Sequence, residues 1–252
     1  MTAATQVKKI PRVVANFDRA AAIPAGYSAG RHIIQSVTLS AIIIAVTLFF
    51  ALKAQPVDWL LLPAFWIAAN FIEWAFHKGP MHRPTKARIL YVNHTLIHHR
   101  AFLHNKMPVN NFREFGLILM PWYTMMMLLT LGAPIAAAAW AWRGVGAVGI
   151  FYLFAICYYL SYEVLHGLYH TPESLQRKLG LWNNRVYKFL ENHHAHHHRL
   201  DRMSHSNFNV TIPLWDTLLG TRETPRLDAD TQQTAEDWDK EMGPEERKEA
   251  EK

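Results

Sequence analysis

Histidines are the most unusual feature of this 252-residue chain, because most of its 15 histidines gather in four short groups. Neutral imidazole is a borderline ligand that suits iron, zinc or copper. The single cysteine, Cys157, excludes a thiolate cluster and a disulfide framework within the chain. The sequence therefore predicts a nitrogen-rich site that can hold two divalent metal ions. The four groups are His77-Lys-Gly-Pro-Met-His82, His94-Thr-Leu-Ile-His98-His99, His166-Gly-Leu-Tyr-His170 and Asn192-His-His-Ala-His-His-His198.

The spacing within three of the groups predicts how the rings are presented. His166 and His170 are four residues apart, so on a helix they share a face and can bind one ion. His94 and His98 share a face in the same way, whereas His99 points about 140° away from His94 on an ideal helix. A one-residue π-bulge would bring His99 round. Gly79 and Pro80 break the helix between His77 and His82, so the chain can turn and offer both rings.

The fourth group allows two registers. Val186, Phe189 and Leu190 mark an apolar face on the helix that leads into it. A projection of about 100° per residue places His193 and His197 near the centre of that face and His196 at its edge. We therefore favour His193, His196 and His197 as ligands, and the register of His194, His197 and His198 stays open. The complete set of predicted ligands is His77, His82, His94, His98, His99, His166, His170, His193, His196 and His197.

Some polar neighbours are candidates for orienting these ligands. Glu73 lies four residues before His77 and Glu163 three before His166, so each carboxylate could accept a ring N–H and fix the tautomer. The alternative is that these carboxylates reach the membrane interface. Asn93 and Asn192 lie beside histidines and are candidates for the same role. We predict no other catalytic residue and no organic cofactor, and we expect His104, His205 and His32 to lie outside the site.

Apolar segments must position the histidines. Residues 33–52 contain no charge, and twenty such residues cross a bilayer core of about 30 Å. Further spans are predicted at about 57–76, 115–139 and 145–165. The turn between the last two lies either at Gly132–Pro134 or at Arg143–Gly144. Buried core helices of a soluble protein are the alternative, which the long uncharged run at 33–52 disfavours. The prediction is an all-α polytopic membrane protein with two hairpins and a helical cap that holds the histidines.

Charge gives the orientation of the predicted domains. The segments are an N-terminal cytosolic part at 1–32, a membrane domain at 33–221 and a disordered acidic tail at 222–252. The tail has 11 of the 20 acidic and 6 of the 26 basic residues, which leaves 20 basic and 9 acidic residues before it. These cations flank apolar spans, a pattern typical of loops that face anionic lipid and not of nucleic-acid binding. Four spans leave only Lys53 and Arg143 on the far side, so the histidine side is predicted to be the cytoplasm. No signal peptide is evident.

With these groups in order, the chain resembles the fatty acid hydroxylase superfamily, which includes sterol desaturases, sterol methyl oxidases and lipid hydroxylases. The resemblance covers about residues 30–221. It rests on the order of the histidine groups, their spacing relative to two hairpins, and a closing stretch from Asn207 to Thr221. Within that stretch the Asn-Phe-Asn and Trp-Asp…Gly-Thr elements look like the ending of the family. One departure concerns His99. Three residues separate His94 from the pair His98–His99, where much of the family has two at this position.

The resemblance implies a di-iron, O2-dependent oxidoreductase that hydroxylates an aliphatic lipid, such as a fatty-acyl chain. Desaturation or sterol-methyl oxidation at the same two metals is the alternative. A metal transporter is disfavoured, because transport predicts ionisable ligands at the bilayer midplane. Zinc can replace iron in purified samples, since such sites bind it more tightly. No cytochrome b5-like domain is fused to the chain, so the expected electron donor is a separate cytochrome b5-like or ferredoxin-like protein. The expected location is a bacterial inner membrane, with the endoplasmic reticulum as the alternative.

Overall fold

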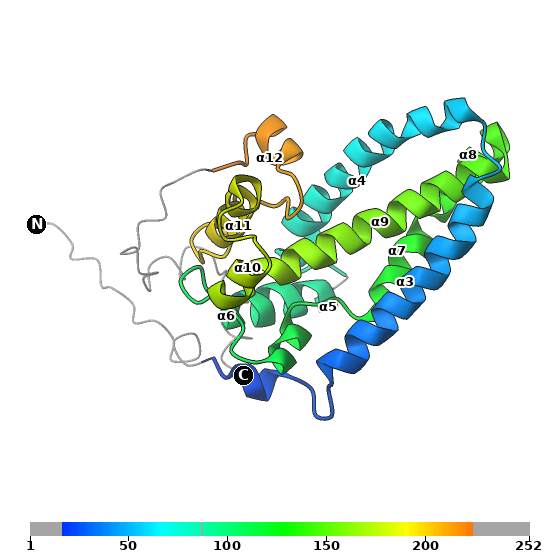
Figure 1. Ribbon diagram of the computed structural model, residues 1–252. Helices are drawn as coiled ribbons and strands as arrows, with labels where there is room; N and C mark the ends of the chain where they lie inside the picture. Colours follow the sequence, from blue (N-terminus) through cyan, green and yellow to red (C-terminus); the bar gives the residue numbers. More distant parts are fainter. Residues whose placement is uncertain (1–16, 87, 224–252) are drawn as a thin grey trace, which may run out of the picture.

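The computed structural model describes residues 17–86 and 88–223, and over these residues the protein is all-helical, as predicted. Long helices form an elongated bundle, and shorter helices gather at one end of it (Figure 1). We call this end the helical cap. Its elements are α2 (Arg19–Ala22), η2 (His77–Met81), α5 (Arg88–Tyr91), η3 (Val92–His98), α6 (His99–Ala101), η4 (Phe112–Leu117), α10 (Glu173–Lys178), α11 (Arg185–His197) and α12 (Leu214–Leu218).

Four helical segments in the described chain are long and apolar enough to cross a membrane, which confirms the predicted number of spans. Apolar side chains such as Ile34 and Phe49 on α3 (Ala29–Ala51) remain largely exposed, as expected of a surface that faces lipid. The third span begins and ends earlier than the predicted 115–139, and the other three agree with prediction to within about five residues. The candidate spans are Ala29–Ala51, Pro56–Met81, Phe112–Leu131 and Val145–Tyr169.

The bundle is built around the contact between α3 (Ala29–Ala51) and α9 (Val145–Tyr169). Two glycines on α9 allow the backbones to approach closely. A Cβ atom at Gly149 would lie 2.2 Å from the backbone nitrogen of Ala51, and one at Gly146 would lie 2.5 Å from the backbone of Ala54. Small residues at helix crossings are the usual means of close packing in membranes. The crossing places the start of α9 beside the end of α3, so that α9 runs back towards the cap.

The second hairpin reverses at Gly144. Gly132 keeps a right-handed helical conformation between α7 (Trp122–Leu131) and α8 (Ala133–Arg143), and its backbone bonds to Leu128 and Ala136 link the two helices. Gly144 has φ 76° and ψ −168°, a conformation that strongly favours glycine. Of the two turn positions left open by the sequence, the structure therefore has the one at Arg143–Gly144. There, Arg143 Nε donates to Asp58 Oδ1 over 2.5 Å, which ties this turn to η1 (Pro56–Leu61).

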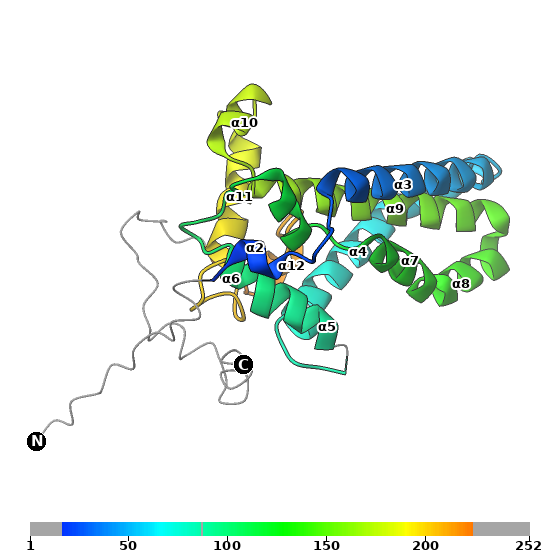
Figure 2. The same ribbon diagram turned by 90° about the horizontal axis from the view of Figure 1, so that it is seen from below.

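The cap closes one end of the bundle, opposite the turn that follows α3 and the turn between α8 and α9 (Figures 1 and 2). Here α4 (Leu62–Phe76) continues directly into η2, and α9 ends beside the cap. Of the predicted N-terminal segment 1–32, residues 17–32 form α2 and the start of α3. Arg222 and Glu223 of the predicted acidic tail pack against the cap through backbone bonds to Asp216 and Asn207. Residues 224–252, to which the prediction of disorder applies, lie outside the described residues.

Candidate metal centre

Ten buried histidines converge in the cap as two groups of five. In each group the five potential ligand atoms lie within 4.8 Å of one another. The groups are neighbours, because the rings of His99 and His198 stack with centroids 4.3 Å apart across the boundary between them. The first group is His77, His82, His94, His99 and His197. The second group is His98, His166, His170, His194 and His198.

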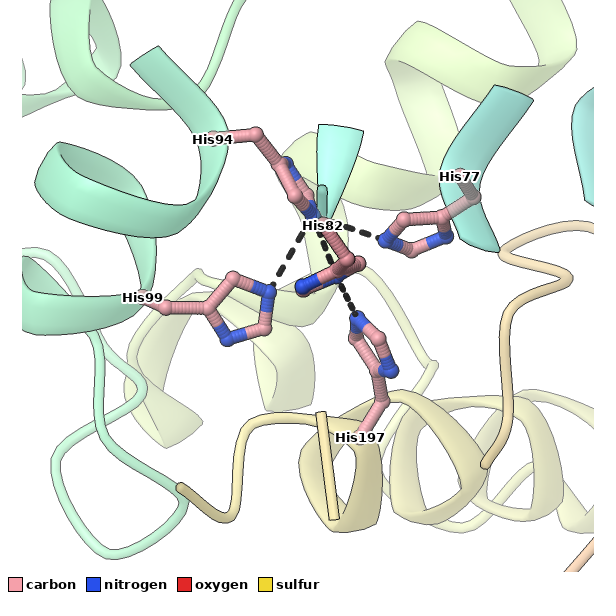
Figure 3. A group of neighbouring side chains, drawn as sticks. All are labelled: His77, His82, His94, His99 and His197. Carbon is pink, nitrogen blue, oxygen red and sulfur yellow. Dashed lines mark hydrogen bonds between the residues drawn. The ribbon is translucent and has the colours of Figure 1, made fainter. Parts of the chain in front are cut away.

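The first group collects rings from three separate parts of the chain (Figure 3). The Nε2 atoms of His77 and His94 are 2.7 Å apart, and those of His94 and His99 are 3.1 Å apart. His82 Nε2 lies 3.2 Å from His94 Nε2 and 3.0 Å from His197 Nε2. Five imidazole nitrogens therefore point at one small volume.

The second group uses the last turns of α9 and α11 together with the end of η3. His166 Nε2 lies 3.2 Å from His98 Nε2, and His170 Nε2 lies 3.3 Å from His194 Nε2. His198 Nε2 closes the group at 3.0 Å from His194 and 3.3 Å from His98. As the sequence predicted, His166 and His170 face the same site.

Backbone carbonyls orient the rings of the first group. His77 Nδ1 donates to Phe208 O, and His197 Nδ1 donates to Ser206 O over 2.8 Å. The hydroxyl of Thr95 donates to Met81 O at 2.7 Å, so it can only accept at its 3.2 Å contact with His82 Nδ1. All three rings therefore carry their hydrogen on Nδ1 and turn a lone pair on Nε2 towards the group.

Carbonyls between the end of α6 and the end of η4 orient three rings of the second group in the same way. His98 Nδ1 donates to Leu117 O over 2.8 Å, and His170 Nδ1 donates to Met107 O over 2.9 Å. His198 Nδ1 donates to Phe102 O. The loop from Phe102 to Leu117 thus fixes the tautomers of three rings in this group.

The tautomers show that both groups fit a metal ion. His82 and His197 face each other with two Nε2 lone pairs 3.0 Å apart, and His98 and His198 do so at 3.3 Å. Two lone pairs at such distances repel each other unless a cation lies between them. A set of ten imidazoles without thiolate or carboxylate is chemically suited to borderline divalent ions such as iron(II) or zinc.

Burial keeps the rings neutral and ready to bind a cation. The pKa of His98 falls to about 4, because burial disfavours the charged imidazolium and, to a smaller extent, His77 and Arg19 repel it. Burial likewise lowers the pKa values of the other group members that lie outside the membrane-spanning segments, with further lowering from neighbouring histidines. These residues are His82, His94, His99, His170, His194, His197 and His198.

The structure brings eight of the ten predicted ligands into the groups, but not His193 and His196. His193 Nε2 contacts Asp216 Oδ2 at 3.1 Å, and His196 Nε2 contacts Glu223 Oε2 at 3.1 Å. The favoured register is wrong in its geometry, because two of the three apolar side chains chosen to mark the inner face of α11 are exposed, Val186 at 69% and Phe189 at 39%. The inner face instead carries Tyr187, Leu190, His194 and His197 at intervals of three, four and three residues. The alternative register of His194, His197 and His198 is the one that reaches the groups.

The predicted π-bulge is confirmed. Val92–His98 form a π-helix, and the backbone N–H of His99 donates to His94 O, five residues earlier. This wider turn places His94 and His99 in the first group, although an α-helix would separate them. It also turns His98 into the second group, so His94 and His98, which would share a face on an ideal α-helix, lie in different groups.

None of the four predicted orienting residues contacts a histidine of the groups through a hydrogen bond in the described chain. Glu73 accepts from the backbone N–H groups of Val210 and Thr211, and Glu163 accepts from the N–H of Met120 over 3.1 Å. Asn93 and Asn192 are exposed. Backbone carbonyls orient the rings instead, and a sequence pattern does not identify which carbonyls will do so.

Sequence reasoning missed the role of Asp216, the aspartate of the closing Trp-Asp element. Its carboxylate accepts from the N–H groups of Phe208 and Asn209, at 3.0 and 2.7 Å, and from the hydroxyl of Thr221 at 2.7 Å. Burial alone would raise its pKa, but the hydrogen bonds from His193 and Thr221 hold the pKa below its ordinary value. Asp216 thereby fixes the segment whose Phe208 carbonyl orients a ring. The Asn-Phe-Asn and Trp-Asp…Gly-Thr elements were the available signal.

Comparison with known proteins agrees with this arrangement. The family model described as "Fatty acid hydroxylase" matches residues 62–221, a range that holds all ten histidines of the two groups. No curated protein and no solved structure matches the chain. The helices α2 and α3 precede the matched range.

Proposed function

Because the chain belongs to the fatty acid hydroxylase family, an oxidoreductase family of membrane enzymes, we propose that it is an O2-dependent di-iron hydroxylase of aliphatic lipids. The observation that carries the proposal is the pair of adjacent imidazole groups whose Nε2 lone pairs face one another. Each group would hold one iron ion. The ligands of the first ion would be His77, His82, His94, His99 and His197. The ligands of the second would be His98, His166, His170, His194 and His198.

When bound, the two irons would supply the oxidising chemistry that an unactivated C–H bond requires, which no side chain of the protein can provide. The residues of the chain bind and orient. Carbonyls at Phe208, Ser206, Phe102, Met107 and Leu117 hold the rings in one tautomer. The ten histidines are all at least 95% buried, so the cap also excludes bulk water from the site.

A lipid substrate is supported by the position of the histidines at the end of four membrane-spanning candidates. A shallow, open groove of about 350 Å³ also lies on the bundle surface between α3, α7, α8 and α9. Most of its exposed lining is apolar, which suits contact with an acyl chain. Tyr152 in this groove lies fourteen residues before His166 on α9. The groove is therefore about 21 Å along the helix from the second histidine group. The groove is lined by Ile43, Thr47, Leu129, Thr130, Ala133 and Tyr152.

We further propose that the multi-pass protein lies in a bacterial inner membrane with its histidines on the cytoplasmic face. The distribution of charge supports the cytoplasmic face, because Lys53 and Arg143 lie at the end of the bundle away from the cap. Electrons would come from a separate cytochrome b5-like or ferredoxin-like protein.

The test compares lipid extracts by mass spectrometry from cells with and without the protein. Hydroxylation predicts a lipid that gains one oxygen, whereas a loss of two hydrogens would assign a desaturase with the same site. His170→Ala is the inactive control, and His104→Ala, outside both groups, should keep activity. The purified wild-type protein, loaded anaerobically with Fe(II), should bind two ions per chain. Unchanged lipids in cells whose purified protein holds two irons would overturn the proposal, and metal flux into proteoliposomes would assign a transporter.

A further inference from the structure

Arg19 binds the loop that orients the second histidine group, although it lies 43 residues before the range matched by the family model. Its guanidinium makes four hydrogen bonds to residues 101–114. Nε donates to Ala101 O over 2.7 Å and Nη2 donates to Lys106 O over 2.6 Å. Nη1 donates to Pro108 O over 2.9 Å and to Glu114 Oε2 over 2.8 Å. Four of its five N–H donors therefore hold one short stretch of chain.

Glu114 completes this clamp from the other end of the loop. The carboxylate is buried, with a side chain 5% exposed, against 13% for the Arg19 side chain. It also accepts from the backbone N–H of Asn110 at 3.0 Å and from the side-chain amides of Asn110 and Asn111. An arginine–carboxylate pair with this geometry and burial is much more restrictive than a surface ion pair.

The carbonyls bound by Arg19 are direct neighbours of two of the three carbonyls that orient the second group. Ala101 precedes Phe102, whose carbonyl accepts from His198 Nδ1. Lys106 and Pro108 flank Met107, whose carbonyl accepts from His170 Nδ1 over 2.9 Å. Because only two backbone dihedrals separate one planar peptide unit from the next, fixing one carbonyl limits how far its neighbour can move.

Side-chain packing forms a second connection between Arg19 and the same group. The guanidinium carbon lies 4.4 Å from the ring centroid of Phe102, which is fully buried. The same ring also contacts the rings of His170, at a centroid distance of 4.6 Å, and of His98, at 5.4 Å. Phe102 thus lies between the arginine and two rings of the second group.

We propose that Arg19, paired with Glu114, is a positioning residue for the second histidine group, and that it controls the retention of the metal ion bound there. The inference depends on the proposed function only in that this group holds a metal. The first group is oriented by Phe208, Ser206 and Thr95, none of which contacts Arg19 through a hydrogen bond in the described chain. The effect of Arg19 should therefore be confined to one of the two ions.

The experiment measures Fe(II) retained per chain after dialysis against a chelator, for Arg19→Ala, Arg19→Lys and wild type. We expect Arg19→Ala to lose one of two ions about 10–100-fold faster than wild type, the usual cost of removing a residue that orients a ligand. Arg19→Lys should be intermediate, since an ammonium cannot reach all four acceptors in the planar geometry of a guanidinium. The control is Arg31→Ala, an exposed arginine of the same N-terminal region.

Double variants assign the lost ion. Arg19→Ala combined with His82→Ala, which removes a ligand of the first group, should lose both ions. Arg19→Ala combined with His194→Ala should lose no more than His194→Ala alone. Equal loss of both ions in Arg19→Ala, or retention of both at the wild-type rate, would overturn the proposal.

Hydrogen exchange of the metal-free chain separates this inference from the proposed function. Arg19→Ala should raise deuterium uptake in residues 101–114, where Val109 N–H donates to His170 O, and leave α9 unchanged. Unchanged uptake in the loop would overturn the clamp whatever metal is bound. If the wild type binds no metal at all, the proposed function fails, while exchange still decides whether Arg19 holds the loop.

Discussion

The two histidine groups contain five imidazoles each, yet different parts of the chain hold them in place. The first group depends on two π-helical segments and on the closing stretch around Phe208, which Asp216 and Glu73 fix from within the family range. The second group depends on the ends of α9 and α11 and on a loop clamped by Arg19. Two groups with the same number of histidines therefore have different structural supports, which is why we propose that Arg19, outside the matched range, affects only the metal of the second group.

The largest expected effect comes from removing one ligand of either group. His197→Ala should release the first ion and His170→Ala the second, and both should reduce turnover below about 1% of wild type. Loss of a ligand must cost more than the roughly 10–100-fold typical of a residue that only orients one. Metal analysis together with product formation measures both effects. His104→Ala is the matched control, and equal activity in all three variants would refute the site.

Asp216→Ala should selectively weaken the first group. The substitution leaves two backbone N–H groups, the hydroxyl of Thr221 and the ring of His193 without their buried acceptor. We expect a loss of about 3–5 kcal/mol in the free energy of unfolding, with faster release of one ion. Thermal unfolding in detergent and metal retention would measure this. Asp216→Asn keeps one acceptor oxygen and should be milder; loss of the second ion first would reverse the comparison of the two groups.

Acid should destabilise the fold through both histidine groups, because burial lowers histidine pKa values in each of them. In the metal-free protein the unfolded chain takes up protons as the pH falls through about 6.5, whereas folded His98 does so only near pH 4. The unfolded state therefore binds more protons, and stability present above pH 6.5 declines by about 1.4 kcal/mol per pH unit for each such histidine. Denaturant melts between pH 8 and 5 measure the slope. A midpoint that stays constant over this range would contradict neutral burial.

Much of this fold follows from the sequence because its signals are local. Twenty uncharged residues at 33–52 must cross a bilayer or be buried, and α3 occupies that stretch. A spacing of four places His166 and His170 together on any regular helix. The five-residue separation of His94 and His99 likewise required a wider turn, and η3 supplies it. In each case a single element determines the outcome.

The errors arose where the outcome depends on tertiary packing. Val186 looks like a core residue by type, but it is exposed, and Leu190 is the member of that apolar set that packs inwards. Because the wrong face of α11 was taken as the inner one, the prediction chose His193 and His196 as ligands in place of His194 and His198. The carbonyls that orient the rings carry no side-chain signature at all, and Arg19 contacts a loop more than 80 residues away. Such contacts are set by the assembled fold.

The smallest effects are expected at His193 and His196, the two members of the last run that lie outside both groups. Neither alanine variant should change the two-ion content, because their rings bind Asp216 and Glu223 instead. His193→Ala leaves the buried Asp216 with one donor fewer and should cost about 1–3 kcal/mol. His196→Ala should cost less, because its partner Glu223 has a side chain 37% exposed and can be solvated. Metal content and thermal unfolding of both variants, beside His194→Ala and His197→Ala, give the comparison. Loss of an ion from either variant, with retention in His194→Ala, would mean that the ligands follow the apolar projection of α11 and that the packing described for its inner face is incorrect.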